Sequence, residues 1–233
     1  MQYVGSKRRI AKDILSEIDK VRASDQLLVE PFCGGCNFTI HTRSPVLAAD
    51  SNGPLIAMWR ALQNGWQPPE NLSEDEYRHI RLNQAEYPPE LVAFIGLGVS
   101  FGAKWFGGFA KNLKGKNYCA ATQKVLLKEI EMLRDVQFVV AQYNELDIPL
   151  GSVIYCDPPY ANTTGYQKTG AFNSRKFYDW CEQKAAKGHH VFVSEYSAPA
   201  HWTVLREWEH TKQLNKNRKE KSTERLYKVN VCA

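Results

Sequence analysis

The stretch Val153-Ile154-Tyr155-Cys156-Asp157-Pro158-Pro159-Tyr160 joins an apolar, β-prone run to two consecutive prolines. Such a run is typical of a buried strand. The first proline keeps Asp157 out of the α region, and neither proline has a backbone donor. The end of the strand therefore presents the Asp157 carboxylate and the Pro158 carbonyl as fixed acceptors, with the ring of Tyr160 beside them. We predict that Asp157, Pro158, Pro159 and Tyr160 form a catalytic site that accepts both hydrogens of an exocyclic amino group; a buried structural turn is the alternative.

The composition fits one α/β domain with a modest insertion, because the chain has 233 residues and 43% hydrophobic content. Its longest uncharged stretch, 91–103, is too short and too rich in glycine to span a bilayer, so we expect no membrane partner. No apolar segment follows the basic N-terminus, and six irregularly spaced cysteines indicate reduced thiols and a cytoplasmic location in a bacterial host cell. Cys33 and Cys36 have no second pair with which to bind zinc, so we expect no metal.

The net charge of +5 is concentrated in two segments. The stretch 91–128 has no acidic residue but contains Lys104, Lys111, Lys114, Lys116, Lys124 and Lys128. The second segment is opposed only by Glu220 and contains Lys212, Lys216, Arg218, Lys219 and Lys221. Basic segments are often only solvated surface. Two of them beside a site that suits a nucleobase indicate a polyanionic partner, either DNA or RNA.

The order of predicted elements indicates a Rossmann-like sheet. Isoleucines at helical spacing predict a helix over 6–21; strands over 26–30 and 46–49 and a helix over 54–63 follow. Further strands are predicted at 136–141, 153–156, 190–195 and 226–231, and a helix at 174–187. Between these two groups, 72–134 is typical of helices around a glycine-rich loop. We therefore predict a catalytic domain formed by 1–64 and 135–233 and a mostly helical insertion over 65–134.

The segment Pro31-Phe32-Cys33-Gly34-Gly35-Cys36 lies where a predicted strand gives way to a helix, and its glycines allow a tight turn close to a ligand. Asp50 follows Gly34 by sixteen residues, at the end of the next strand, where an acid typically binds ribose hydroxyls. Neither a G-x-G-x-x-G motif nor a P-loop is present. We therefore predict a nucleoside with a small cationic tail, S-adenosyl-L-methionine, and expect Glu30 to help hold its sulfonium or amino end.

In their order along the chain, these motifs resemble the DNA adenine methylase (Dam-like) family of adenine-specific DNA methyltransferases, in the form that phages carry. The matching segments are Tyr3-Val4-Gly5-Ser6-Lys7, Val29 to Gly35, Asp50-x-Asn52-x-x-Leu55, Asp157 to Tyr160, Gly165-Tyr166, Phe177 to Trp180, Val193 to Tyr196 and Glu224 to Tyr227.

The resemblance implies a cofactor site shared by Tyr3, Lys7, Asp50 and Asp157, with Phe32 and Gly34 lining the loop. It also implies that the insertion is a target-recognition region, in which we expect Lys104, Lys111, Lys114 and Lys116 to bind DNA. One departure is Cys36, which stands where the family usually has a second spaced glycine; we expect Gly35 to serve instead.

The sequence therefore predicts a monomeric enzyme that methylates the N6 atom of a flipped-out adenine in double-stranded DNA, of the kind found in phages and in restriction–modification systems. Alternatives are methylation of cytosine N4, RNA or a glutamine amide, and a catalytically weak DNA-binding phage protein. The aspartate before the two prolines favours adenine, and the intact Asp50 and Asp157 disfavour a degenerate pocket.

Overall fold

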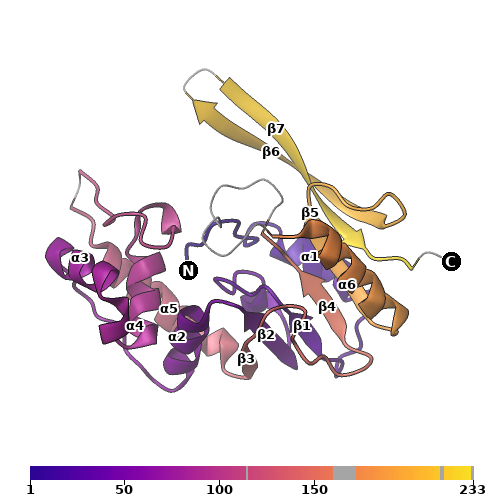
Figure 1. Ribbon diagram of the computed structural model, residues 1–233, viewed down its shortest axis with the longest axis horizontal. Coiled ribbons are helices and arrows are strands. Elements are labelled where there is room, and N and C mark those ends of the chain that lie inside the picture. The colour runs from indigo at the N-terminus through magenta and orange to yellow at the C-terminus, as the bar shows by residue number, and fades with distance from the viewer. Residues whose placement is uncertain (114, 160–171, 216–217, 232–233) are drawn as a thin grey trace.

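The protein is a mixed α/β structure built on one sheet (Figure 1). The computed structural model describes residues 1–113, 115–159, 172–215 and 218–231, and along 210–220 it describes the backbone alone. Within these residues seven strands pair in the order β3-β2-β1-β4-β5-β7-β6. Their bounds are Leu28–Glu30 (β1), Val46–Asp50 (β2), Val136–Val140 (β3), Val153–Cys156 (β4), His190–Glu195 (β5), Thr203–Asn215 (β6) and Arg218–Lys228 (β7).

The strand order contains a topological switch point between β1 and β4. From β1 the chain proceeds outward through β2 and β3, then returns to the other side of β1 as β4 and continues to β5. These five strands are parallel, and β7 is antiparallel to both of its neighbours. Open sheets of this kind bind ligands at the carboxyl ends of the strands beside the switch point. The predicted Rossmann-like fold is confirmed.

The two faces of the sheet are buried beneath different helices because alternate strand residues point to opposite sides. Leu28, Val153 and Phe192 join a core with helices α1 (Ala11–Ile18) and α2 (Gly53–Gln63). Val29 and Ile154 join a second core beneath helix α6 (Ser174–Ala186). The central strands are thus apolar on both sides, as in other sheets covered by helices on both faces.

Helix α2 begins and ends at residues whose chemistry fits those positions. The Asn52 side chain caps its start by accepting a hydrogen bond from the amide of Leu55 at 3.2 Å. At the other end Gly65 adopts φ +86°, and the amides of Gly65 and Trp66 donate to the carbonyls of Leu62 and Ala61. This pattern satisfies carbonyls that the helix leaves open. The N-cap follows β2 directly, so it also fixes the end of that strand.

The segment between α2 and β3 forms a helical lobe beside the sheet (Figure 1). Its main helices are α3 (Glu74–Leu82), α4 (Pro89–Ala93), a π-helical turn (Phe94–Gly98) and α5 (Tyr118–Ile130). The Tyr77 hydroxyl lies 2.8 Å from the Ser100 hydroxyl and accepts a hydrogen bond from the Gly108 amide at 3.1 Å. Tyr77 thus holds both ends of the glycine-rich segment 100–108. The helical character is as predicted; a role in target recognition remains a prediction.

Two predicted elements differ from the structure. The N-terminal helix covers only Ala11–Ile18 instead of 6–21, because the chain before it turns to bring the Lys7 side chain inward, where it is 4% exposed. The last strand is Arg218–Lys228 instead of 226–231, and the long strand β6 was not predicted. Both strands are rich in charge and pair with each other over most of their length, so burial does not mark them in the sequence. Among the described residues, no helix has the length and apolar character needed to cross a membrane.

Candidate active site at the carboxyl edge of the sheet

Acidic side chains gather where five neighbouring strands meet one edge of the sheet. Glu30, Asp50 and Glu195 are the last residues of β1, β2 and β5, and Asp157 directly follows β4. The fifth acid, Glu224, lies in β7 beyond the residue that pairs with the end of β5. Parallel strands end at a common edge, so residues far apart in the sequence become neighbours here. An edge with this much negative charge suits a cationic ligand.

Lys7 links two of these acids. Its Nζ lies 2.7 Å from Asp157 Oδ1 and 3.2 Å from Glu224 Oε1, and it donates to the Gly5 carbonyl at 3.1 Å. Burial alone would lower the pKa of Lys7, but attraction from Asp157, Tyr155 and Glu224 outweighs it and raises the pKa. Lys7 is therefore charged at neutral pH. Removing one partner of a buried ion pair costs about 3–5 kcal/mol, so this contact fixes the N-terminal segment against two strands.

Asp157 and Glu195 titrate close to neutrality. Burial raises the pKa of Asp157 to about 6, while the charge and hydrogen bond of Lys7 act in the opposite direction. The Asp157 side chain is 19% exposed, so one part of the carboxylate can meet a ligand. Burial raises the pKa of Glu195 to about 7, and its Oε1 accepts a hydrogen bond from the Tyr196 amide at 3.0 Å. At pH 7 Asp157 is mostly ionised and can act as an acceptor.

Asp50 holds the glycine-containing loop through both carboxylate oxygens. Its Oδ2 accepts from the Gly34 amide at 3.0 Å and its Oδ1 from the Asn52 amide at 2.9 Å. Burial raises the pKa of Asp50, and these two amides partly offset that effect. Each carboxylate oxygen has two lone pairs, so each retains capacity for one more donor. Asp50 therefore fits a ligand that presents two neighbouring hydroxyl groups.

The two spaced loop positions, Gly34 and Cys36, both adopt left-handed backbone conformations, with φ +47° and +52°. Cys36 itself adopts the left-handed conformation that glycine favours. Gly35 is absent from the described residues of positive φ, and it serves the loop instead by leaving room for the Tyr3 side chain. Cysteine at such a φ carries a cost of about 1–2 kcal/mol. Cys36 is fully buried in the core, which holds it in place.

The ring of Tyr3 lies against the loop and explains the need for small residues there. A Cβ atom at Gly34 or Gly35 would come within 2.7 Å of Tyr3 side-chain atoms, closer than real contacts allow. The Gly34 carbonyl also accepts a hydrogen bond from Trp59 Nε1 at 3.1 Å. The loop is thus held between the N-terminal segment and helix α2.

The sequence matches a known protein family over most of its length. The model of the D12 class N6 adenine-specific DNA methyltransferases matches residues 3–90 and 104–229. The chain belongs to this family. The protein is therefore an adenine-specific DNA methyltransferase. Enzymes of this family use S-adenosyl-L-methionine as the methyl donor.

Individual relatives are more distant. The chain is 26% identical to the retron Ec67 DNA adenine methylase of Escherichia coli over 237 aligned residues, which cover 90% of this chain and 81% of that protein. Similar solved structures include a putative RNA methyltransferase from Pyrococcus horikoshii, with a TM-score of 0.43, 10% identity and coverage of 94% and 80%. A tRNA methyltransferase from Aquifex aeolicus has a TM-score of 0.41, 10% identity and coverage of 99% and 72%. The assignment rests on the family match.

The structure brings together most residues predicted for the methyltransferase site. Lys7 contacts Asp157, Asp50 contacts Gly34, and Tyr3 covers Gly34. Pro158 and Pro159 continue from Asp157 at the end of β4, whereas Tyr160 lies outside the described residues.

Phe32 has a second role besides lining the loop. Its ring centroid lies 5.5 Å from that of Tyr143 and 5.7 Å from that of Phe177 in α6. Aromatic pairs at these distances pack favourably. Phe32 therefore attaches the glycine-containing loop to helix α6 on the other face of the sheet.

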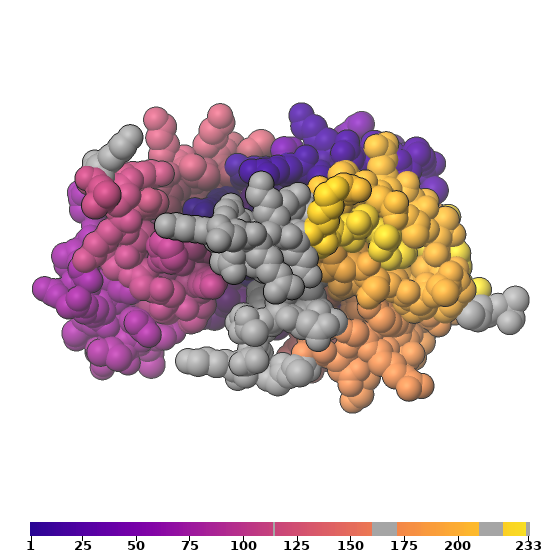
Figure 2. All heavy atoms as spheres, turned by 90° about the horizontal axis from the view of Figure 1, so that it is seen from above, coloured from indigo at the N-terminus to yellow at the C-terminus, as the bar shows by residue number. Residues whose placement is uncertain are grey.

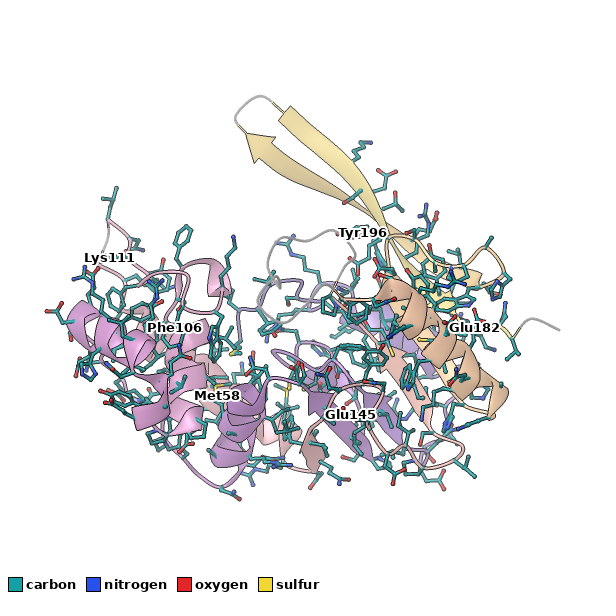
Figure 3. All side chains as sticks on the ribbon, viewed as in Figure 1. Met58, Phe106, Lys111, Glu145, Glu182 and Tyr196 are labelled. Carbon is teal, nitrogen blue, oxygen red and sulfur yellow. The ribbon has the colours of Figure 1, made fainter. Side chains whose placement is uncertain are left out.

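The lysines predicted to bind DNA lie on the helical lobe. Lys104, Lys111 and Lys116 are exposed, and Lys114 lies outside the described residues. Figure 3 shows Lys111 in the outer part of the lobe, far from Tyr196 at the end of β5. Lys111 Nζ forms an ion pair with Glu74, and Lys116 Nζ lies 4.8 Å above the Tyr118 ring. A stretch without acids in sequence is therefore partly neutralised by an acid from helix α3.

Two acids of the site, Glu195 and Glu224, were not given a role from the sequence, although both lie in segments that resemble the family. The position of Glu195 at the end of an apolar strand is a signal that could have identified it. Glu224 carries no such signal, because only the antiparallel register of β7 places it beside Lys7.

We expect Gly34→Ala to lower the free energy of unfolding by about 2–5 kcal/mol, from a strained φ and from the clash with Tyr3. Gly65→Ala is the matched control, because Gly65 also has a positive φ, but a Cβ atom there would meet no other atom within 4 Å. It should cost only about 1–2 kcal/mol. Chemical denaturation of Gly34→Ala, Tyr3→Ala and the double variant separates the backbone strain from the clash with Tyr3. If the clash contributes, Gly34→Ala should cost less in the absence of the Tyr3 ring. An equal cost in both backgrounds would show that the contact with Tyr3 is not the cause.

Proposed function

We propose that the enzyme transfers a methyl group to the N6 atom of an adenine that has been turned out of double-stranded DNA. The observation that carries this proposal is the Asp157 carboxylate, which is partly exposed beside the switch point and is fixed by Lys7. A base within a duplex cannot reach this edge, and flipping it out costs a few kcal/mol. The family supports adenine in DNA over cytosine, RNA or a protein amide as the substrate.

The described residues fit S-adenosyl-L-methionine. Asp50 retains acceptor capacity for two ribose hydroxyls, and the group of acids around Lys7 suits a cationic ligand. When bound, this cofactor supplies the methyl group and the positively charged sulfur from which it leaves. Glu30 is a weaker candidate ligand than the sequence predicted. Its carboxyl group is fully buried, accepts a hydrogen bond from the Thr39 hydroxyl, and has a pKa raised well above its usual value by burial.

Asp157 and the Pro158 carbonyl would accept the two hydrogens of the adenine amino group. Two such acceptors draw the nitrogen toward a tetrahedral shape and localise its lone pair for attack on the methyl carbon. Asp157 is also positioned to take up the proton that N6 releases after the new N–C bond has formed. Rate enhancement would come mainly from fixed geometry and a preorganised polar site. The ion pair with Lys7 keeps the Asp157 carboxylate oriented throughout.

The helical lobe would contact the duplex, and the enzyme would act as a monomer. Lys104 and Lys116 are exposed there without an acidic partner among the described ion pairs, and they would contact phosphates. Contacts to phosphates position a protein on DNA but carry no sequence information. Lys111 would contribute less than the sequence predicted, because Glu74 already neutralises it.

We expect Asp157→Ala to lower the rate of methyl transfer by about 10²–10³-fold, because it removes a preorganised acceptor. The protein should remain folded, since Lys7 keeps Glu224 as a partner. Asp157→Asn should be milder, because the amide oxygen still accepts a hydrogen bond. The measurement is transfer of labelled methyl groups to adenine-containing duplexes, with circular dichroism as the folding control. An Asp157→Ala variant with more than about a tenth of wild-type activity contradicts the proposed role.

The rate of methyl transfer should fall as the pH decreases through about 6. Below its pKa of about 6, protonation turns one Asp157 oxygen into a donor and weakens the ion pair with Lys7. The carboxyl group can then no longer take up the proton that N6 releases. Single-turnover rates at saturating substrates between about pH 5 and 8 would show the decrease. If the decrease at low pH is unchanged in Glu195→Gln but absent in Asp157→Asn, the titrating group is Asp157. If the decrease at low pH persists in Asp157→Asn, another group is responsible for it.

We expect Asp50→Ala to weaken binding of S-adenosyl-L-methionine by about 10- to 100-fold, because it removes the acceptor of two hydrogen bonds worth about 0.5–1.5 kcal/mol each. Binding of DNA should change far less. Glu145→Ala is the control, because Glu145 is an exposed acid in the loop after β3. Isothermal titration calorimetry measures the cofactor directly, and equal dissociation constants for Asp50→Ala and wild type would show that the ribose binds elsewhere.

A further inference from the structure

Strands β6 and β7 continue well beyond the rest of the sheet. Strand β5 ends at Glu195, which pairs with Arg225, whereas the pairing of β6 with β7 continues to Asn215 and Arg218. Because β7 is antiparallel to β5, its residues before Arg225 lie past the carboxyl end of β5. Residues 218–224 therefore extend about 20 Å beyond the edge that carries Asp157. Figure 1 shows this two-stranded ribbon projecting from the body of the protein.

The base of the ribbon is attached to the catalytic domain. Arg206 Nε donates to Glu17 Oε1 at 2.8 Å, and Trp208 Nε1 donates to Asp13 Oδ2 at 3.2 Å, so β6 is held by helix α1. On β7, Glu224 is paired with Trp208 in the ladder and contacts Lys7. We define the arm as residues 209–223, which follow this last anchored pair. Its base is thus connected directly to the ion pair that holds Asp157.

The arm contains much of the net charge of the protein. It has two acids, Glu209 and Glu220, and five basic residues, which are Lys212, Lys216, Arg218, Lys219 and Lys221. This excess of three positive charges lies in fifteen residues of a chain whose total is +5. Leu214 is the one large apolar residue of the arm, so the ribbon has no apolar face with which to bind another protein. Lys216 lies outside the described residues, and the other four basic positions are placed by the backbone ladder. Lys221 Nζ lies 3.5 Å from Glu209 Oε2, so Lys212, Arg218 and Lys219 are the main candidates for phosphate contacts.

We propose that the arm is a second DNA-binding surface, separate from the helical lobe, which contacts the phosphate backbone of the duplex whose target adenine lies at the edge that carries Asp157. The inference rests on the proposed function, because it takes duplex DNA as the substrate. Figure 2 shows the helical lobe and the sheet domain on opposite sides of the middle of the molecule. The arm leaves the sheet at the edge that carries Asp157, and Figure 1 shows the ribbon leaning over the middle toward the lobe. A cationic ribbon in this position matches the regular negative charge of a duplex.

A different role for these charges would be to prevent edge-to-edge pairing of an exposed ribbon, for which lysine is well suited. The two roles differ in a measurable way. Charges that contact phosphates release counterions from DNA and therefore determine how strongly affinity depends on salt. Charges that only protect an edge leave that dependence unchanged.

The test compares two triple variants that remove the same charge. The arm variant is Lys212→Gln, Arg218→Gln and Lys219→Gln. The control is Arg43→Gln, Arg134→Gln and Lys187→Gln, three exposed residues that precede β2, β3 and β5 at the opposite edge of the sheet. Binding to a duplex of about 30 base pairs is measured at several salt concentrations. We expect the arm variant to bind all duplexes more weakly and to lose about 0.9 in log–log slope for each phosphate contact removed. The control should retain the wild-type slope.

A shortened variant guards against misfolding of the charge variant. Replacing 210–222 with Asn-Gly joins the paired residues Glu209 and Thr223 by a two-residue turn that favours hairpins. It should show a loss of slope at least as large as that of the charge variant, because it removes all five basic residues of the arm, while cofactor binding reports an intact domain. Wild-type slopes in both arm variants would overturn the role of the arm. Methylation of adenine by the wild-type enzyme is measured in parallel, and its absence would overturn the proposed function separately.

Discussion

The buried ion pair between Lys7 and Asp157 is the contact on which the arrangement of the site depends. It joins the N-terminal segment to the end of β4, and the second contact of Lys7 with Glu224 adds β7. A buried cation needs a close partner, because an unpaired charge in the interior costs several kcal/mol. The position of the N-terminal segment in turn brings Tyr3 onto Gly34, so the geometry of the cofactor loop follows from the same interaction.

The electrostatics of the edge separate two functions among chemically similar side chains. Asp50 receives two backbone amides, and its remaining lone pairs suit the hydroxyls of a sugar. Asp157 receives a lysine and keeps an exposed part, which suits the acceptance of a base amino group. Burial raises the pKa of both acids, and their partners oppose that effect. The difference in their partners, rather than in residue type, gives each carboxylate its role in the proposed reaction.

The proposed DNA surface combines two structures that differ in how they are stabilised. The helical lobe shares the hydrophobic core on one face of the sheet, and within it Tyr77 is almost fully buried and its hydroxyl lies 2.8 Å from that of Ser100. The arm has no comparable core and depends on cross-strand pairing and on its anchors to α1 and Lys7. A two-stranded ribbon is only marginally stable by itself. The anchors at its base therefore set the direction in which the arm projects. Through Glu224 they also connect the proposed DNA-binding arm to Lys7, which holds Asp157.

The sequence by itself determined the parallel core of the sheet and the two acids that define the site. Apolar runs such as Val153 to Cys156 are fully buried, and the residues after them mark where strands end, so Asp50 and Asp157 could be placed at the ends of strands. These are local signals of burial and backbone conformation. That the two acids share one site followed only from the resemblance to the family. The tertiary structure alone decided the partners: the pairing of Lys7 with Glu224, the neutralisation of Lys111 by Glu74, and the projection of the arm. Each of these depends on strand register or on packing between distant segments, and residues separated by many positions carry no local pattern that reveals such contacts.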